Sequence, residues 1–502
     1  MEKNKNLTIE EIFNLAVKNH QESKTDIAQE LYNQVLKINP NYTNAHYNLG
    51  VTFKELGENQ KAKDCFEKTI EINPNYTNAH NNLGNIFQEL GEYQKAKDCF
   101  EKTIEINPNY TNAHYNLGIT FKELRENQKA RDCYQKVIEI NSNHVDAHYN
   151  LGLIFQELGE YQKAKDCYQK VIEINSNHID AHNNLGLIFQ ELGENQKAKY
   201  CFEKTIEINP NYTNAHNNLG NIFQELGEYQ KAKDCYQKAI KLNPNYVDAY
   251  WNLHGLSKDM AEALLILKKL YKIDNNFTKA KIMISALEGY KGNFDMFNEI
   301  LNSSESNHPI TRSVKWGFSL PKLPKIFFYR WDFFDAIIAS SEISRPFYEF
   351  GVWNGISFQY LINTFKRGFG FDTFRGLPED WHDEKKGTYS AFGKVPKIKG
   401  GEFIVGKFED TLSDFFLKER SMASLINFDA DLYSSTLCAL NYSNKIIDEK
   451  TILVFDEFII NDKWEEDEFK ALNEFCNNLD YDYEVLAISF FTKQVAVKLK
   501  KI

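Results

Sequence analysis

Three features are scarce or missing in this sequence of 502 residues: long apolar runs, an excess of basic residues, and paired cysteines. No uninterrupted apolar run approaches the roughly 18 residues that are needed to cross a bilayer. The first residues, MEKNKNLTIEEIF, include charges but no apolar core, so we expect no secretory signal. The net charge of −11 argues against a general binder of nucleic acid or anionic membranes, because phosphate contacts need clustered Lys and Arg.

None of the eight cysteines forms a C-x-x-C motif, so a zinc site is not expected. Six of them occupy one position in successive copies of a repeat, as a small buried apolar residue would. They are Cys65, Cys99, Cys133, Cys167, Cys201 and Cys235. This spacing does not suggest disulfides, and we expect a reduced protein in the cytoplasm.

The sequence does contain a repeat of 34 residues. NYTNAHYNLGVTFKELGENQKAKDCFEKTIEINP (41–74) recurs nearly unchanged from residues 75, 109, 143, 177 and 211, so that six units span 41–244. Each unit has the apolar spacing of two helices, the second of which ends at Pro74 in the first copy. Gly50 would let the two helices approach closely, and Gly57 suits a left-handed helix C-terminus.

This unit resembles the tetratricopeptide repeat family, which has the same length and the same order of Leu-Gly, aromatic, Gly, Ala, aromatic and Pro. His46 stands where the family often has Trp. The resemblance covers about 60% of the chain and implies an all-α superhelix over 8–304. Because terminal repeats must cap the stacked core, we interpret 8–40 as a diverged first unit, 245–276 as a shortened unit and 277–304 as a closing helical pair.

One position of the first helix carries asparagine in every unit: Asn48, Asn82, Asn116, Asn150, Asn184, Asn218 and Asn252. In the tetratricopeptide repeat family this position faces the concave groove, where asparagines can bind the backbone of an extended peptide. Alternatively, these residues make only local hydrogen bonds within the array. The first interpretation predicts a protein or peptide partner, and the polar residues Asn81, Asn85 and Gln88 favour it.

The composition changes after residue 305. We expect a linker or entry segment over 305–330 and a second domain over 331–502, which is rich in aromatic residues. Strand-like runs cover 347–353, 368–374, 403–408, 424–431, 451–458, 483–490 and 494–501. Helical runs between them predict a doubly wound parallel sheet. The last two strands are too close for a crossover helix, so we expect them to form an antiparallel hairpin.

Acidic residues follow the strands at the edge of the sheet where ligands bind in such a fold. They are Glu349, Asp372, Asp429, Asp431, Asp456 and Glu457. A single Asp after a strand usually caps the next helix, but acids after four strands favour a site. The turn after the first strand carries Gly351 and Gly355, which would let the backbone approach a ligand. Asp372 stands where an acid can bind a ribose, which does not separate NAD from S-adenosylmethionine.

This second domain resembles the macrocin-type O-methyltransferase family of class I enzymes. The resemblance rests on YEFGVWNGIS, GFDTFRGLPE, GKFEDTL, FDADLYSST and VFDEF, which occur in this order within 310–502. It implies a Rossmann-like domain with a seven-stranded sheet. It also implies transfer of a methyl group from S-adenosylmethionine to a hydroxyl, often of a sugar, with a divalent metal such as Mg²⁺.

The resemblance assigns a role to each matching position. It assigns cofactor binding to Glu349, Gly351, Gly355, Ser357 and Asp372. It assigns metal binding to Asp429, Asp456 and Glu457, and the catalytic base to Asp431. The family usually has Asp-Asp where this chain has Asp456-Glu457. A hard cation binds carboxylate oxygens and can lower the pKa of a hydroxyl, whose proton a nearby carboxylate can take.

The loop 381–402 is a candidate substrate lid, in which Trp381, His382 and Tyr389 would contact the acceptor. It can equally be an ordinary surface loop. Taken together, these patterns predict an O-methyltransferase for a sugar or glycoconjugate, joined to a repeat array that binds a partner or the substrate. The alternatives are an adaptor with an inactive methyltransferase domain, a methyltransferase that modifies a protein side chain, and an NAD-binding oxidoreductase.

Overall fold

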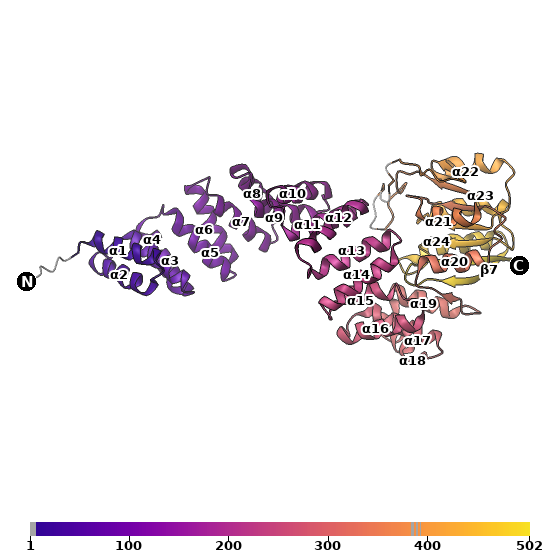
Figure 1. Ribbon diagram of the computed structural model, residues 1–502, viewed down its shortest axis with the longest axis horizontal. Coiled ribbons are helices and arrows are strands. Elements are labelled where there is room, and N and C mark those ends of the chain that lie inside the picture. The colour runs from indigo at the N-terminus through magenta and orange to yellow at the C-terminus, as the bar shows by residue number, and fades with distance from the viewer. Residues whose placement is uncertain (1–6, 383–385, 388–389, 392) are drawn as a thin grey trace, which may run out of the picture. The chain divides into compact units, whose positions relative to one another are not determined.

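The computed structural model describes residues 7–382, 386–387, 390–391 and 393–502, and the chain divides into two compact units at residue 210 (Figure 1). Within these described ranges, no helix is both long and apolar enough to cross a membrane. All eight cysteines lie in the described ranges and are free thiols.

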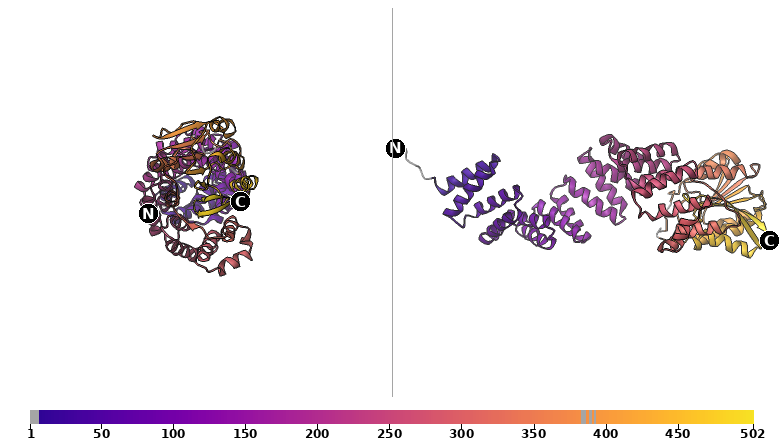
Figure 2. Two further views of the ribbon diagram at one scale, coloured as in Figure 1. Left: turned by 90° about the vertical axis from the view of Figure 1, so that its right-hand side faces the viewer. Right: turned by 90° about the horizontal axis from the view of Figure 1, so that it is seen from below.

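The first unit consists of helices in which each consecutive pair packs together and stacks on the next pair (Figures 1 and 2). The helices are α1 (Ile9–Gln21), α2 (Thr25–Ile38), α3 (Thr43–Glu55), α4 (Asn59–Ile72), α5 (Thr77–Glu89), α6 (Tyr93–Ile106), α7 (Thr111–Glu123), α8 (Asn127–Ile140), α9 (Val145–Glu157), α10 (Tyr161–Ile174), α11 (Ile179–Glu191) and α12 (Asn195–Ile208). Their bounds follow the predicted period, and the first pair coincides with the predicted diverged unit.

Two glycine positions of the repeat explain how the pairs close, and every full repeat has both except 109–142, where Arg125 replaces the second. A Cβ atom on Gly50 would lie 2.7 Å from the ring of Phe66, so the two helices pack closer than any larger residue allows. Gly57 ends its helix with φ +75°, which is the left-handed conformation that glycine adopts without strain. Both sequence predictions are confirmed.

The histidine of the repeat closes the turn that precedes its helix. The Nε2 atom of His46 lies 2.9 Å from the carbonyl oxygen of Pro40, and His80 makes the same bond to Pro74. His148 bonds to the carbonyl of Ser142, so the interaction does not depend on proline. The ring therefore satisfies a carbonyl group that the turn leaves without a helical partner.

The second unit begins with helices that continue the repeat pattern. They are α13 (Thr213–Glu225), α14 (Tyr229–Leu242), α15 (Val247–His254), α16 (Met260–Ile273), α17 (Thr278–Tyr290), α18 (Asp295–Leu301) and α19 (Pro309–Ser319). The segment 305–330, expected as a linker or entry segment, is not a structureless connection, because it contains α19 and the short strand β1 (Lys325–Ile326). Its polar start, NSSESNHP, forms a short 3₁₀ helix (Ser304–Asn307) and the beginning of α19 rather than a flexible connection.

A mixed sheet follows. Its elements are α20 (Arg330–Ala339), β2 (Phe347–Phe350), α21 (Ile356–Phe365), β3 (Gly368–Asp372), β4 (Gly401–Val405), α22 (Phe408–Leu417), β5 (Leu425–Phe428), α23 (Tyr433–Ser443), β6 (Ile452–Phe455), α24 (Glu468–Asn478), β7 (Tyr481–Ile488) and β8 (Val495–Lys501). Short 3₁₀ helices cover Asn444–Ile446 and Trp464–Glu466. The strand order is β1-β7-β8-β6-β5-β2-β3-β4, and among the described strands β8 alone runs antiparallel. The sheet therefore has eight strands where seven were predicted, because β1 adds an edge strand beside β7.

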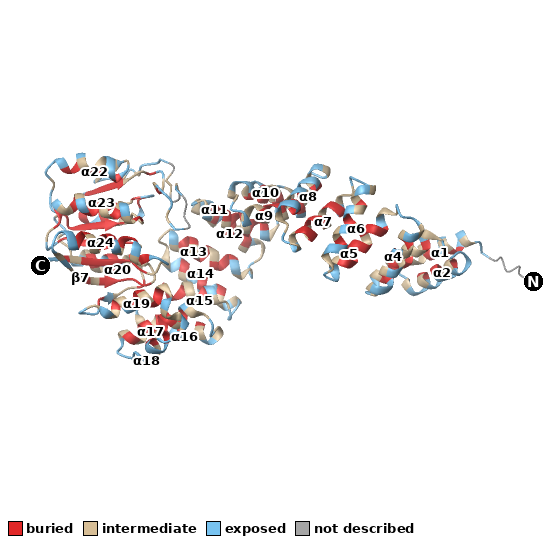
Figure 3. Cartoon of the chain, turned by 180° about the vertical axis from the view of Figure 1, so that it is seen from behind, coloured by how far each residue is buried: buried red, intermediate tan, exposed pale blue. Residues whose placement is uncertain are grey.

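Helices cover both faces of this sheet, as the doubly wound pattern predicts (Figure 3). On one face, Phe333 of α20 and Leu361 of α21 pack with Leu425 and Ile452 of the strands. On the other face, α22, α23 and α24 pack over the alternate strand residues. Neighbouring strand residues point to opposite faces, so a strand that is buried on both sides has a continuous run of apolar residues in its sequence.

The end of the repeat array shares a core with the sheet, which explains why the chain divides at residue 210 and not near 305. Leu267 of α16 and Met283 of α17 belong to the same buried cluster as Phe455 of β6. The indole of Trp316 on α19 packs against Phe458, with ring centroids 5.7 Å apart. Burial of this common apolar surface makes α13–α19 and the sheet one compact unit.

Candidate active site at the edge of the sheet

Four phenylalanines form a row across the sheet, one residue before the candidate site. Phe371, Phe350, Phe428 and Phe455 are in register on β3, β2, β5 and β6. The rings of neighbouring strands stack, with centroids 4.7 Å apart for Phe350 and Phe371. This register places the residues that follow, Asp372, Gly351, Asp429 and Asp456, in a second row at the carboxyl edge. The strands β3 and β4 are added on one side of β2 and the strands β5 and β6 on the other, so the strand order reverses between β2 and β5. Folds of this kind bind ligands at such a switch point.

Gly351 lies where the turns after β2 and β5 meet. Its φ is +89°, and a Cβ atom there would lie 1.8 Å from the carbonyl oxygen of Asp429. The backbone amide of Asp429 also donates to the carbonyl of Phe350 at 2.8 Å. Only glycine fits between these two backbone segments, whereas approach of this turn to a ligand stays a prediction.

Asp372 organises the turn after β2. One carboxylate oxygen accepts hydrogen bonds from the backbone amides of Val352 and Trp353, at 2.8 and 2.7 Å. The other accepts from the amide of Phe374 at 2.6 Å. Since an ionised carboxylate has about four acceptor sites, Asp372 can still accept from a ligand hydroxyl.

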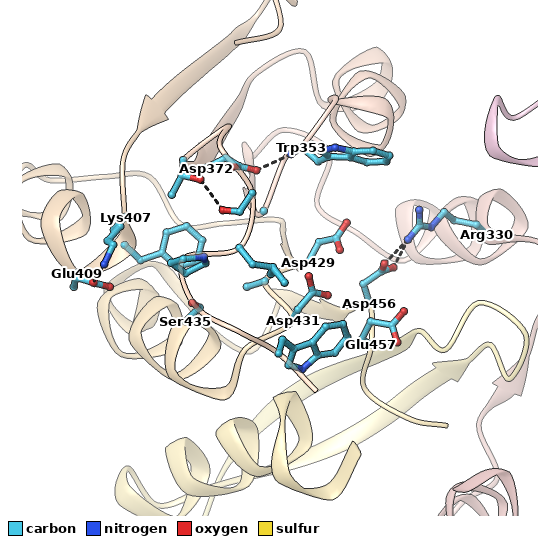
Figure 4. A pocket seen from close by; sticks show the side chains of 18 residues that line it. Arg330, Trp353, Asp372, Lys407, Glu409, Asp429, Asp431, Ser435, Asp456 and Glu457 are labelled. Atoms are coloured by element: carbon cyan, nitrogen blue, oxygen red, sulfur yellow. Dashed lines mark hydrogen bonds and ion pairs between the residues drawn. The ribbon is translucent and has the colours of Figure 1, made fainter. Parts of the chain in front are cut away.

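A cavity of about 270 Å³ opens at this edge (Figure 4). Six of the predicted site residues line it: Gly351, Asp372, Asp429, Asp431, Asp456 and Glu457. The other lining residues are Arg330, Trp353, Thr373, Gly376, Leu377, Pro378, Trp381, Lys407, Phe408, Glu409, Ala430 and Ser435. The structure therefore brings the acids at the ends of three strands, β3, β5 and β6, to one pocket, while β2 contributes Gly351.

Three predicted cofactor residues lie behind the wall of this cavity. Glu349 is fully buried within β2, and one of its carboxylate oxygens accepts from the Asn427 amide at 2.9 Å while the other has no partner. Burial raises the pKa of Glu349 to about 7, although the Ser357 hydroxyl, the Asn427 amide and Arg330 oppose the rise. Gly355, with φ +80°, caps the start of α21 and packs against Pro396.

Asp429 and Asp431 point into the cavity (Figure 4). Across the described part of the chain, no hydrogen-bond donor reaches either carboxylate. Burial, with the nearby Asp456 carboxylate, raises the pKa of Asp429 well above its usual value. Burial, with the nearby Glu457 carboxylate, also raises the pKa of Asp431 well above its usual value. The backbone of Asp431 has φ +57°, which is rare for a residue other than glycine. Both groups are therefore suited to holding or accepting a proton.

Asp456 and Glu457 are already paired with protein cations. The Arg330 guanidinium donates to both carboxylate oxygens of Asp456, and the Gln494 amide donates to one of them at 2.5 Å. The Lys493 ammonium lies 2.7 Å from Glu457. Among the described residues, no three His, Cys, Asp or Glu side chains are grouped so that they could hold a metal ion. Two of the three members of the predicted metal site, Asp456 and Glu457, are thus paired with protein cations in this structure, and only Asp429 is not.

The sequence analysis missed Arg330, Lys493 and Gln494. Arg330 is the last residue of the expected linker or entry segment, and a single arginine there carries no motif. Lys493 and Gln494 had a usable signal: because the last strand was predicted to run antiparallel, its first residues must lie at the edge where the parallel strands end. A further signal for the site was that four strands end in Phe followed by Gly or Asp.

The candidate lid is only partly described. Trp381 lines the cavity, and the His382 imidazole bonds to the carboxylate of Asp467 at 2.8 Å, which ties this end of the loop to the start of α24. Tyr389 lies outside the described residues. Contact of Trp381 with an acceptor stays a prediction.

The asparagines that occupy one position of the first helix in every repeat, here called the asparagine ladder, make hydrogen bonds between neighbouring repeats. The Asn82 amide donates to the Tyr47 hydroxyl at 3.2 Å, and Asn150 and Asn184 make the equivalent bond at 3.1 Å. In the next repeat Asn81 stands at the position of Tyr47, and there the Asn116 amide donates to the side-chain oxygen of Asn85 at 2.8 Å. Asn48 lies on α3 at the same position, and Asn218 lies on α13. These bonds confirm a local structural role, while peptide binding stays a prediction.

Comparison with known families identifies the repeats. The tetratricopeptide repeat family matches residues 43–76, 77–110, 145–178, 179–212 and 213–246, and related tetratricopeptide families match 20–57, 99–132 and 121–159. The chain therefore contains a tetratricopeptide repeat array. An array of this kind indicates protein interaction or scaffolding, with protein or peptide partners.

Several solved repeat proteins are similar to part of the chain. YrrB, described as a TPR protein with an unusual peptide-binding site, is 24% identical over 37% of this chain and 95% of its own, with a TM-score of 0.34. MamA is 26% identical over 32% of this chain and 95% of its own, with a TM-score of 0.32. PilF of Pseudomonas aeruginosa is 20% identical over 43% and 97%, with a TM-score of 0.37. No curated protein matches the sequence.

Proposed function

We propose that the sheet domain is an O-methyltransferase that uses S-adenosylmethionine and acts on a hydroxyl of a sugar or glycoconjugate, while the repeat array binds a protein partner or the substrate. The observation that carries this proposal is the row of acids that opens on one cavity at the switch point of the sheet. The antiparallel last strand, which lies between β6 and β7, agrees with the class I arrangement that the sequence resembles.

The residues at the β2 and β3 ends fit an adenosine cofactor. Asp372 is fixed by three backbone amides and keeps acceptor capacity for a ribose hydroxyl. Gly351 lines the cavity, and its lack of a side chain lets the turns after β2 and β5 meet there. When bound, S-adenosylmethionine supplies an electrophilic methyl group.

The acids that follow β5 would activate the hydroxyl that accepts the methyl group. A hydroxyl is a poor nucleophile until its proton is removed. Asp431 faces the cavity without a donor of its own, and its raised pKa makes it a stronger base than an exposed carboxylate. The cavity walls hold the hydroxyl in line with the donor, and such alignment supplies a large part of the rate.

Calorimetry with S-adenosylmethionine tests this proposal directly. We expect saturable binding by the full chain, and a loss of affinity of about tenfold in Asp372→Asn, because an amide accepts hydrogen bonds more weakly than a carboxylate. Asp410→Asn, at an exposed position of α22, is the matched control and should bind normally. Absence of binding by a folded wild-type chain would contradict the proposal.

A second candidate function is an adaptor with an inactive sheet domain. The tetratricopeptide array favours it, since an array alone accounts for partner binding. The same calorimetry separates the two, because an adaptor has no need of the cofactor. Mass spectrometry of cellular glycans and glycoproteins, with and without the gene, would then identify the acceptor by a difference of one methyl group.

A further inference from the structure

The acidic side of the pocket concentrates more negative charge than its paired cations balance. Four carboxylates line this side, those of Asp429, Asp431, Asp456 and Glu457, and two buried ones behind it, Glu349 and Glu468, interact with them electrostatically. Two cations are paired with members of this cluster, Arg330 with Asp456 and Lys493 with Glu457. Buried charges of one sign are costly unless a cation or protons neutralise them. A positive group near the centre of this site lowers that cost for the carboxylates that stay ionised.

Arg330 occupies that position. One guanidinium nitrogen donates to both oxygens of Asp456, and Arg330 also acts electrostatically on Asp429 (Figure 4). The guanidinium lines the cavity, and the side chain is 30% exposed there. Its Nε atom is inaccessible to solvent and has no hydrogen-bond partner. Arg330 thus neutralises one acid and borders the space where a ligand would lie.

The helix that carries Arg330 is held from two sides. Trp331 stacks on Tyr360 of α21, with ring centroids 4.2 Å apart. Tyr329 packs edge-to-face against Tyr229 of α14, with centroids 5.3 Å apart. These contacts on both sides of Arg330 fix the backbone from which its side chain reaches Asp456. This placement is fixed by packing rather than by a free surface side chain.

We propose that Arg330 takes the place of a divalent cation in this pocket and that the site works without a metal. Asp456 is unavailable as a metal ligand because Arg330 binds both of its oxygens, and Lys493 holds Glu457 in the same way. Arg330 is then a positioning residue, whose remaining donors face an acceptor oxygen while Asp431 takes the proton. The acceptor contact depends on the proposed methyl transfer, whereas the charge replacement does not.

Binding of Mn²⁺, followed by electron paramagnetic resonance of the free ion, tests the replacement. The wild-type chain should show no saturable site. In Arg330→Met the freed Asp456, with Asp429 beside it, should bind one Mn²⁺ at least roughly tenfold more tightly than wild type, because the competing positive charge is gone. The double variant Arg330→Met/Asp456→Asn should lose this gain.

Arg345→Met is the matched control, since Arg345 also bonds to both oxygens of an aspartate, Asp448, outside the cavity. It should gain no Mn²⁺ site. Saturable Mn²⁺ binding by the wild type that Asp429→Asn abolishes would overturn the proposal, and this measurement needs no Arg330 variant to fold. A folded Arg330→Met chain that gains no site would overturn it as well.

Calorimetry with S-adenosylmethionine on the same samples keeps the two proposals apart. Cofactor binding with no Mn²⁺ site in the wild type supports both. An unchanged Mn²⁺ result without cofactor binding leaves the charge replacement standing and removes methyl transfer. Arg330→Lys should resist Mn²⁺ as the wild type does, because a single positive charge is preserved, and gain of a site in this variant would contradict the electrostatic argument.

Discussion

The rings of Phe428 and Phe455 stack with their centroids 4.9 Å apart and their planes 11° from parallel. Each ring precedes an acid, Asp429 or Asp456, so the stacking that aligns the strands also aligns the carboxylates. Cross-strand aromatic pairs are a main source of stability in a sheet. The core of this domain therefore sets the geometry of its candidate site.

Gly351→Ala should disrupt the pocket. The new Cβ would lie 1.8 Å from the Asp429 carbonyl oxygen, in a backbone conformation of φ +89° that alanine disfavours. We expect a lower midpoint of thermal unfolding and a loss of S-adenosylmethionine binding by calorimetry. Gly317→Ala is the control, since the nearest atom to its new methyl group would be at 3.6 Å, and it should behave as wild type. Normal binding by Gly351→Ala would show that the two turns can separate.

Glu349 should make the protein less stable as the pH rises. Its pKa is about 7 in the folded chain against 4.5 for a free side chain, because burial disfavours the charged form. The folded state therefore binds more protons between these values, and stability falls from about pH 4.5 to pH 7 and then levels off, by about 3 kcal/mol at most. Asp429 and Asp431 act in the same direction.

Glu349→Gln should flatten this dependence and raise the unfolding midpoint at pH 8, while keeping an acceptor for Asn427. Thermal unfolding at several pH values measures the effect. Glu402→Gln, at an exposed position of β4, is the control and should follow the wild type. A Glu349→Gln curve parallel to that of the wild type would mean that Glu349 does not titrate in this range.

The Asn82–Tyr47 bond should stabilise the array. Asn82→Ala and Tyr47→Phe each remove this hydrogen bond, and we expect each to cost about 1 kcal/mol. A double-mutant cycle from denaturant unfolding should give a coupling of similar size. If the single changes leave stability unchanged but weaken capture of a partner, the asparagine ladder serves binding rather than structure.

Arg125 should lower the stability of the repeat array. It adopts φ +59° at the helix end where Gly57, Gly91, Gly159 and the later units have glycine. A left-handed residue other than glycine costs roughly 1 kcal/mol, so Arg125→Gly should raise stability by about that amount. Gly159→Arg, the reverse change in the next unit, should lower it equally. Calorimetric unfolding, with hydrogen exchange of α7 and α8, measures both.

Much of this architecture was predictable because its signals are local. The spacing of Gly50 and Gly57 predicted where helices meet and end, and alternating strand and helix runs predicted helices on both faces of the sheet. The acids after the strands were predicted to gather at one edge, and they do. The linker was not predictable, since the polar residues of 304–309 suit a loop and a helix start equally well.

The sequence by itself determined the repeat, its turn glycines and the acids at the strand ends, because each depends on residues within one or two turns of the chain. Only the tertiary structure decided which acids are free. Asp456 is paired by Arg330, which lies 126 residues earlier, and Glu457 by Lys493, which lies 36 residues later. Pairing of charges depends on distance in space, and strand order and helix packing set that distance. The carboxylates of Asp429 and Asp431 are therefore left without a hydrogen-bond donor among the described residues, while Asp456 and Glu457 are paired with cations.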